Sequence, residues 1–213
     1  MEQNPSICAS GTWITQFTQD TYLHISEPAT NPQTVRERTL FNGPQIMHPT
    51  AMIRTEAIKA INGYDEAFLC AQDYDLWLRL LDYGDLANIP KSLLFYRIHE
   101  TSTSSTKIEQ QVINHFIALR KSEMRFDNKI CNNIRSHSWE TVFSLLDPQT
   151  PSFYVILSLL IHRNISNKSK KISMILNKIS YDPQKINKLY LQNANITWEE
   201  VTAFIQSKIN NNK

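Results

Sequence analysis

Two carboxylates near the middle of the chain, Asp73 and Asp75, have the side-chain chemistry for moving a proton. Both fall in the first turn of a predicted helix over residues 72–83, where the positive end of the helix dipole favours an ionised side chain. They are two positions apart, so they point about 200° apart around the helix and cannot share one site. One of them can face a cleft while the other caps the helix or pairs with an arginine. Capping by both is the alternative.

The same predicted helix carries Trp77 and Arg79, and each has two interpretations. Trp77 either belongs to the core or stacks on the flat apolar face of a sugar ring. Arg79 either neutralises a nearby carboxylate or contacts a phosphate. Spacing alone leaves both choices open.

A third candidate group, Arg97 and His99, ends a predicted strand and precedes a loop rich in Ser and Thr. By strand alternation the two side chains lie on the same face. A histidine at a strand end beside a polar loop is more open to chemistry than one on an apolar helix face. A single histidine is nevertheless more often structural than a ligand.

The elements that must position these residues alternate between strands and helices as far as residue 98. Asn31 is predicted to cap a helix that has Pro32 at its first position and stops at Gly43. Thr55 is predicted to cap a short helix over 56–61, and Pro90 is predicted to separate two strands. The predicted strands are 6–17, 21–25, 51–54, 86–89 and 92–98.

The character of the chain changes after about Thr106, because no glycine follows Gly84 and the strand-like alternation disappears. Helices are predicted over 108–126, 130–146, 152–163, 169–180, 183–191 and 198–209. Pro148 and Pro151 mark a break near 147–151. We therefore predict an α/β domain over residues 1–105 and an all-α C-terminal region over 106–209.

The composition excludes several classes of protein. With 41% hydrophobic and 10% aromatic residues the chain is globular, and its net charge of +2 gives no strong attraction to nucleic acid. Three scattered cysteines suggest neither zinc nor disulfides, which favours the cytoplasm, with peripheral association with a membrane as a second option. The longest apolar run, 153–161, is shorter than the ~20 residues that cross a bilayer, so we predict a buried or interfacial helix and no transmembrane segment.

Short motifs occur in a fixed order between residues 48 and 99. They are His48-Pro49-Thr50, Arg54, Gly63-Tyr64-Asp65, the run from Gln72 to Arg79, Asn88-Ile89-Pro90 and the run from Tyr96 to His99. In order and spacing this block resembles the C-terminal half of the catalytic domain in family 2 glycosyltransferases, which have the GT-A fold. The resemblance covers about residues 40–105 and, more weakly, 6–40, but not the helical tail.

The resemblance implies a role for each candidate residue. Asp73 falls where the family places its general base, and Gln72 stands where the family usually has Glu. His99 falls where some members supply a ligand to the divalent metal, Mg²⁺ or Mn²⁺, on the donor diphosphate. The acceptor or diphosphate side would hold His48, Asp75, Trp77, Arg79 and Arg97.

The resemblance also implies a half that these residues do not contain. Family members carry a nucleotide-binding half with an Asp-x-Asp motif before the matched block, whereas here Asp73-Tyr74-Asp75 is the only such motif. The implied fold is thus a partial GT-A nucleotide-diphospho-sugar transferase, either truncated or completed by a separate chain that supplies the donor half. Both cases predict a sheet edge and an apolar face left for that half to cover, and little turnover by the isolated chain.

The implied partners are a nucleotide-sugar donor and an acceptor hydroxyl on a glycan, a lipid-linked saccharide or a protein, as in polysaccharide biosynthesis. The alternative is a non-catalytic interaction module, or a truncated remnant, derived from a glycosyltransferase.

Overall fold

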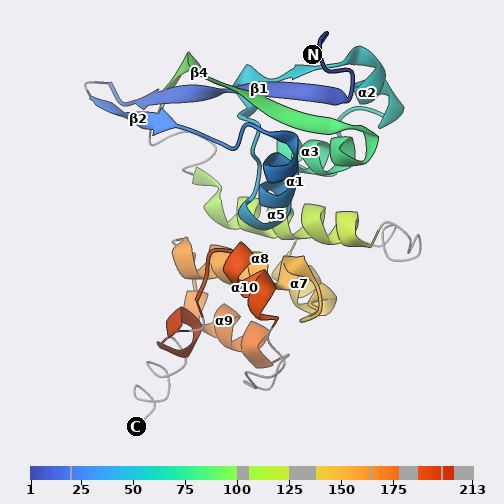
Figure 1. The fold of residues 1–213 in the computed structure, drawn as a ribbon. Helices are drawn as coiled ribbons and strands as arrows, with labels where there is room; N and C mark the ends of the chain where they lie inside the picture. The colour runs from blue at the N-terminus through green and yellow to red at the C-terminus, as the bar shows by residue number, and fades with distance from the viewer. Residues whose placement is uncertain are drawn as a thin grey trace.

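The computed structural model describes residues 1–19, 21–99, 106–124, 138–163, 165–177, 187–197 and 199–203. A sheet forms one end of the molecule, and helices lie in successive layers on one side of it (Figure 1). The elements up to residue 99 are β1 (Ile7–Phe17), β2 (Tyr22–Ser26), α1 (Pro32–Asn42), the 3₁₀ turn η1 (His48–Thr50), β3 (Met52–Ile53), α2 (Thr55–Ala60), α3 (Gln72–Tyr83) and β4 (Asp85–Arg97). The later elements are α5 (Ile108–Glu123), α7 (Trp139–Leu145), α8 (Pro151–His162), α9 (Lys168–Asn177) and α10 (Lys188–Asn193).

The sheet is built around β1 and is mixed in direction. Strand β4 runs parallel to β1 along almost the whole length of β1. Strands β2 and β3 pair with β1 in the antiparallel direction. Since β4 occupies one edge of β1, the two short strands share the opposite edge, one at each end. The chain is therefore a mixed α/β protein, as the sequence predicts.

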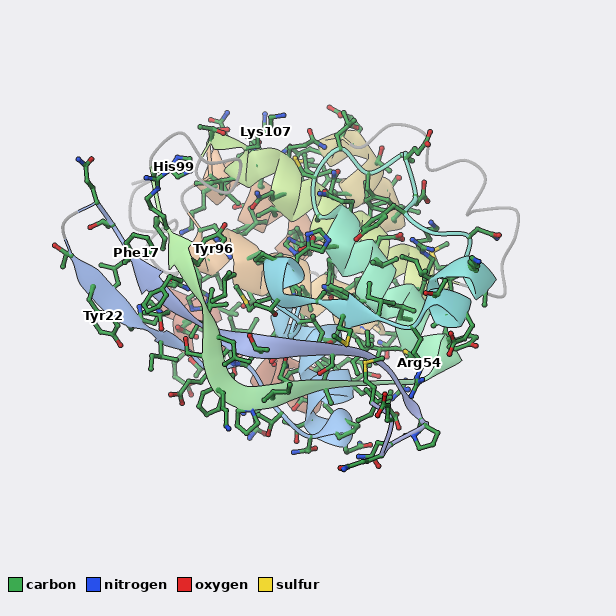
Figure 2. The ribbon with its side chains drawn as sticks, turned by 90° about the horizontal axis from the view of Figure 1, so that it is seen from above. Phe17, Tyr22, Arg54, Tyr96, His99 and Lys107 are labelled. Carbon is green, nitrogen blue, oxygen red and sulfur yellow. The ribbon has the colours of Figure 1, made fainter. Side chains whose placement is uncertain are left out.

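The prediction of two strands separated by Pro90 is wrong, because β4 is a single strand that passes through this residue. Thr12 pairs with Ile89 and the next residue of β1 pairs with Ser92, so Pro90 and Lys91 bulge out of the ladder. A proline is tolerated at such a bulge because its missing N–H has no partner to lose. Figure 2 shows the sharp bend of β4 that results.

Two helices of the α/β part have the predicted capping signals. Helix α1 begins at Pro32 after Asn31, whose side chain accepts a 2.9 Å hydrogen bond from the Thr34 amide, and ends before Gly43 at φ 89°. Helix α3 has the predicted bounds and ends at Gly84. Thr55, in contrast, is the first residue of α2 and caps nothing with its side chain, so its predicted role is wrong.

The described elements beyond residue 106 are helices. The bounds of α5, α8 and α9 follow the prediction within a few residues. Helix α7 begins at Trp139 after the N-cap Ser138, so the predicted helix over 130–146 is wrong at Ser138, and residues 130–137 lie outside the described residues. In α10, Asn187 is the N-cap and accepts a hydrogen bond from the Tyr190 amide. The predicted helix over 183–191 is therefore wrong at Asn187, because the helix begins only at the next residue. The all-α expectation for 106–209 stays a prediction, because 125–137, 178–186 and 204–209 lie outside the described residues. No helix within the described ranges is long and apolar enough to cross a bilayer.

Two hydrophobic clusters meet at α3. One joins the sheet to α1, α2 and the Leu76, Trp77 and Leu80 side of α3. The other joins Tyr74 and Leu78, on the opposite side of α3, to the helices from α5 onward. Burial on both faces fixes the position of this helix, and with it the first turn that carries the acidic residues.

The far side of the sheet carries exposed apolar side chains. Phe95 and Leu93 on β4 are 77% and 64% exposed, and Tyr22 on β2 is 60% exposed. Among the described residues no strand pairs with the outer edge of β4. The sequence predicts a face of this kind beside a missing half, and exposed apolar patches mark interaction surfaces.

Glycine is required at position 11 because β1 passes close to Asn88. A Cβ there would lie 2.5 Å from the Asn88 Oδ1 atom and 3.0 Å from the Ile46 side chain. Asn88 cannot move away cheaply, since its amide donates to the backbone oxygens of Ala29 and Gln45 at 2.7 and 2.9 Å.

We therefore expect Gly11→Ala to lower the free energy of unfolding by about 2 kcal/mol, the usual cost of an overpacked core, as measured by urea denaturation. Gly43→Ala is the comparison for backbone strain without a steric clash, because open space surrounds that position and only its positive φ is strained, at a cost of about 1–3 kcal/mol. An unchanged free energy of unfolding in Gly11→Ala would contradict the steric argument.

Candidate functional site

The first turn of α3 presents Asp73 beside the loop between α2 and α3. The helix begins after Ala71, which is in the left-handed region at φ 56° and provides no side-chain cap. The Asp73 Oδ1 atom accepts a 2.9 Å hydrogen bond from the Tyr74 amide, one of the amides that a helix start leaves unpaired. Asp73 is half-buried and lies in the first turn of α3.

Tyr64 and His48 form a polar pair near this carboxylate. The His48 Nε2 atom and the Tyr64 hydroxyl share a hydrogen bond of 2.8 Å, and both side chains are exposed. The part of the Tyr64 side chain that is shielded from water raises the pKa of its hydroxyl, and the negative charge of Asp73 raises it further. Tyr64 is thus hydrogen-bonded to the predicted site residue His48 and lies within electrostatic range of Asp73.

Trp77 lies in the core and is 0% exposed. Its ring packs edge-on to His48 at a centroid distance of 6.1 Å. Of the two interpretations, the structure therefore places Trp77 under the site, where it supports His48, rather than on the surface where a sugar could stack. Its indole nitrogen is buried without a hydrogen-bond partner among the described residues.

Asp75 points away from Asp73, as the helical spacing requires, and is the buried member of a network of partly exposed charges. The Arg79 Nε atom donates to Asp75 Oδ2 at 2.8 Å, and Lys121 on α5 lies 3.4 Å from the other carboxylate oxygen. Arg79 also donates to the backbone oxygens of Ile61 and Gly63, both at 2.7 Å.

Lys121 completes this network through Asp65, 2.5 Å away. Burial alone would raise the pKa of the Asp65 carboxyl, but the hydrogen bond from Lys121 and the charge of Arg79 lower it below its usual value. The network holds the loop that carries Tyr64 against α3. Neither Asp caps the helix from the N-cap position.

Arg97 and His99 lie at the exposed end of β4. Figure 2 shows His99 and Tyr96 at this end of the strand, with Arg54 at the opposite end of the sheet. Arg97 pairs with Phe17 at the last position of the ladder with β1.

Within the described residues no three His, Cys, Asp or Glu side chains are grouped to hold a metal ion. A divalent cation of the Mg²⁺ type needs several oxygen ligands, so His99 alone does not make a site and the metal stays a prediction.

Three residues near the site were given no role by the sequence. Tyr64 belongs to a recognisable turn motif, but His115 and Lys121 on α5 reach α3 only through tertiary packing. The His115 ring packs edge-on to Tyr74 at a centroid distance of 4.8 Å. Burial lowers the pKa of His115 to about 4, opposed by the charge of Asp73 and assisted by that of Arg163.

This low pKa predicts acid sensitivity. Between pH 6.5 and about 4 the unfolded chain binds a proton on His115 that the folded protein does not, so stability present above pH 6.5 is lost as the pH falls. Urea denaturation should show this as a loss of about 2–3 kcal/mol from pH 7 to pH 4.5. In His115→Gln most of this loss should disappear; an unchanged pH dependence would show that other groups cause it.

We compared the chain with protein families and with known proteins. No family model matches the chain. A protein of Methanocaldococcus jannaschii described as the uncharacterized glycosyltransferase MJ1057 is 32% identical over 135 residues, which are 60% of this chain. Chondroitin synthase of Escherichia coli is 27% identical over 116 residues, or 51% of the chain. The O-antigen biosynthesis glycosyltransferase WbnJ of Escherichia coli is 39% identical over 64 residues, or 29% of the chain.

The matched regions cover only part of each relative: 43% of the archaeal protein, 17% of chondroitin synthase and 25% of WbnJ. All three relatives carry the name of a sugar-transferring enzyme or a polysaccharide synthase, and the mixed α/β structure is compatible with such a fold. At modest identity, these similarities support a glycosyltransferase family for this chain.

Proposed function

We propose that this chain forms the acceptor-side part of an inverting family 2 glycosyltransferase with a GT-A fold, and that Asp73 is its general base. The observation that carries the proposal is the half-buried carboxylate of Asp73 at the start of a helix whose two faces are fixed in hydrophobic cores. The similarity to glycosyltransferases supports it.

The proposed reaction is a single displacement. An acceptor hydroxyl on a glycan, a lipid-linked saccharide or a protein attacks the anomeric carbon of a nucleotide-activated sugar. As the new C–O bond forms, the hydroxyl proton passes to the Asp73 carboxylate. The bond from the anomeric carbon to the diphosphate breaks, and the nucleoside diphosphate leaves with the electron pair. A carboxylate within hydrogen-bond reach of the acceptor hydroxyl can take this proton as a general base.

The proposal needs a nucleotide-binding half, which we assign to a polypeptide segment outside residues 1–213. The exposed Leu93 and Phe95 on β4 support a covering segment at this edge. The relatives are all longer than the region that they share with this chain, which is consistent with such a segment.

The remaining predicted residues divide into two groups. We assign His48 to direct contact with the acceptor, since it is exposed beside Tyr64, and Arg97 to the diphosphate side, since it is exposed at the end of β4. Asp75, Arg79 and Trp77 act by positioning, because they are occupied in the buried network or the core.

A non-catalytic interaction module is the second candidate, and the apolar face of the sheet favours it. The two candidates share the docking surface and differ only in chemistry. A measurement of turnover therefore separates them.

The test is release of nucleoside diphosphate from a panel of nucleotide sugars with Mn²⁺ and hydroxyl acceptors. The assay compares the chain alone with the chain fused behind a nucleotide-binding half taken from a longer relative. We expect turnover only from the fusion. Turnover by the chain alone would contradict the need for another segment, and none from any fusion would favour the interaction module.

The expected metal dependence is tested at His99. In the active fusion, His99→Ala should raise the Mn²⁺ concentration for half-maximal rate by roughly tenfold, the usual effect of weakening a metal site. His24→Ala, on the exposed β2, is the matched control and should leave the Mn²⁺ response unchanged. An unchanged response in His99→Ala would make that histidine structural.

A further inference from the structure

A cavity of about 340 Å³ lies at the junction of the α/β part and the helices that follow it. Its walls come from the end of α1, from Tyr74 on α3, from His115 on α5, from α8 and from the turn after α10. Segments far apart in the sequence thus meet around one space, and ligand sites are common where two structural parts meet. The resemblance of residues 40–105 to a transferase gives no role to the helices that complete this cavity.

Part of the wall is aromatic and held in place. Phe41 is partly exposed and packs on Tyr190 at a centroid distance of 5.6 Å, which holds its ring in place. The Tyr74 ring is fully buried, and its hydroxyl donates a 2.8 Å hydrogen bond to the Thr39 backbone oxygen. A fixed ring offers a flat apolar surface without loss of side-chain entropy on binding. Sugar rings use such surfaces for their apolar faces.

The same wall contains a neutral hydrogen-bonding group. Burial keeps His115 uncharged near pH 7, and one of its ring nitrogens is engaged with the backbone of Gln111. In a neutral imidazole whose one nitrogen donates, the other is an acceptor. It can therefore accept a hydrogen bond from a ligand hydroxyl, and the Asn195 side chain at the same cavity adds an amide.

The rim carries positive charge. Arg163, the residue after α8, is exposed, and no ion pair to it exists among the described residues. Its neighbour His162 lies 3.7 Å from Glu200, so Arg163 is the cation available to a ligand on this rim. A guanidinium binds carboxylate or phosphate through paired hydrogen bonds.

From this combination we infer that the helical region completes a binding pocket for a saccharide unit that carries a carboxylate or a phosphate. The sugar ring lies against Phe41, and the anionic group pairs with Arg163. The inference rests on the proposed function in one respect: the cavity borders α3, the helix that carries the proposed base Asp73, so we take a saccharide bound here to be part of the acceptor.

The test measures binding to the full chain without any donor, by NMR titration with glucuronate, glucose 6-phosphate and neutral glucose. We expect saturable binding of at least one anionic sugar with Kd on the order of 1 mM and at least tenfold weaker binding of glucose. Binding of glucuronate alone, of the phosphate alone or of both identifies the anionic group and supports the pocket. No saturation by any of them, or equal binding of glucose, overturns it.

Two variants and a control locate the site. Arg163→Gln should raise Kd for the anionic sugar about tenfold, which is ~1.4 kcal/mol, and Ser158→Leu should fill the cavity and abolish binding. Lys170→Gln removes an exposed charge of α9 outside the cavity and should change nothing. An unchanged Kd in Arg163→Gln overturns the inference. Circular dichroism checks that each variant is folded.

These outcomes are independent of sugar transfer. If the anionic sugars bind but the fusion with an unchanged Asp73 shows no turnover, the proposed function fails and the pocket stands. If transfer is observed but the anionic sugars do not bind, the pocket fails and the proposed function stands.

Discussion

Replacing Asp73 by Asn should lower the rate of sugar transfer about 10³-fold, the contribution typical of a general base. The amide keeps the shape of the side chain and can still accept from the Tyr74 amide, so the helix should be intact. It cannot take the proton of the acceptor hydroxyl. The barrier should therefore rise by about 4 kcal/mol, while the affinity for the donor is almost unchanged because Asp73 does not act on the nucleotide.

The measurement is nucleoside diphosphate release by the fusion that contains a nucleotide-binding half, together with the donor Kd. Asp82→Asn is the matched control, since Asp82 lies at the other end of the same helix and is exposed. A reduction of less than about tenfold in Asp73→Asn would assign the base elsewhere, with Asp75 the next residue to test. A large loss in Asp82→Asn would mean that the assay reports stability instead of chemistry.

Loss of the Asp75 charge should be the most destabilising single change near the site. Asp75→Asn leaves the Arg79 guanidinium and the Lys121 ammonium facing a neutral amide in a site where the Asp75 side chain is only 3% exposed. Removing one partner of a buried ion pair costs 3–5 kcal/mol. Since Arg79 and Lys121 are partly exposed and water screens them, we expect a loss of about 3 kcal/mol.

Urea denaturation provides the free energy of unfolding for a set of variants. Asp65→Asn should cost less than about 1 kcal/mol, because its side chain is about a third exposed and Lys121 keeps Asp75 as a partner. Asp75→Asn with Arg79→Met should recover part of the loss, because the only cation left is then Lys121, which pairs with Asp65. Equal effects of Asp65→Asn and Asp75→Asn would show that burial does not set the strength of the network.

Capping residues and apolar spacing in the sequence predicted the helices whose ends are set by neighbouring residues. Asn31 followed by Pro32 determines where α1 begins, and the apolar spacing of Leu76 and Leu80 with Gly84 beyond them determines α3. The strand β4 could not be predicted as one piece, since the tolerance for Pro90 comes from a bulge against β1 that exists only after the sheet has formed.

In the candidate site, too, some features follow from local sequence and others only from tertiary packing. Helical spacing separates Asp73 from Asp75, and the structure agrees with that geometry. Whether Trp77 faces solvent or core depends on the sheet and the loop that pack around it, so the residue alone left both choices open. Lys121 and His115 come from a helix outside the resemblance, and only the folded chain brings them to α3.

The shared position of α3 has a consequence for how the chain unfolds. One side of this helix belongs to the core under the sheet and the other to the core formed with α5. Cutting between residues 105 and 106 would expose Phe68, Tyr74 and Leu78, which α5 and the helices beyond it help to bury. The two parts are therefore coupled into one cooperative unit, and local opening of the helical region loosens the helix that carries Asp73.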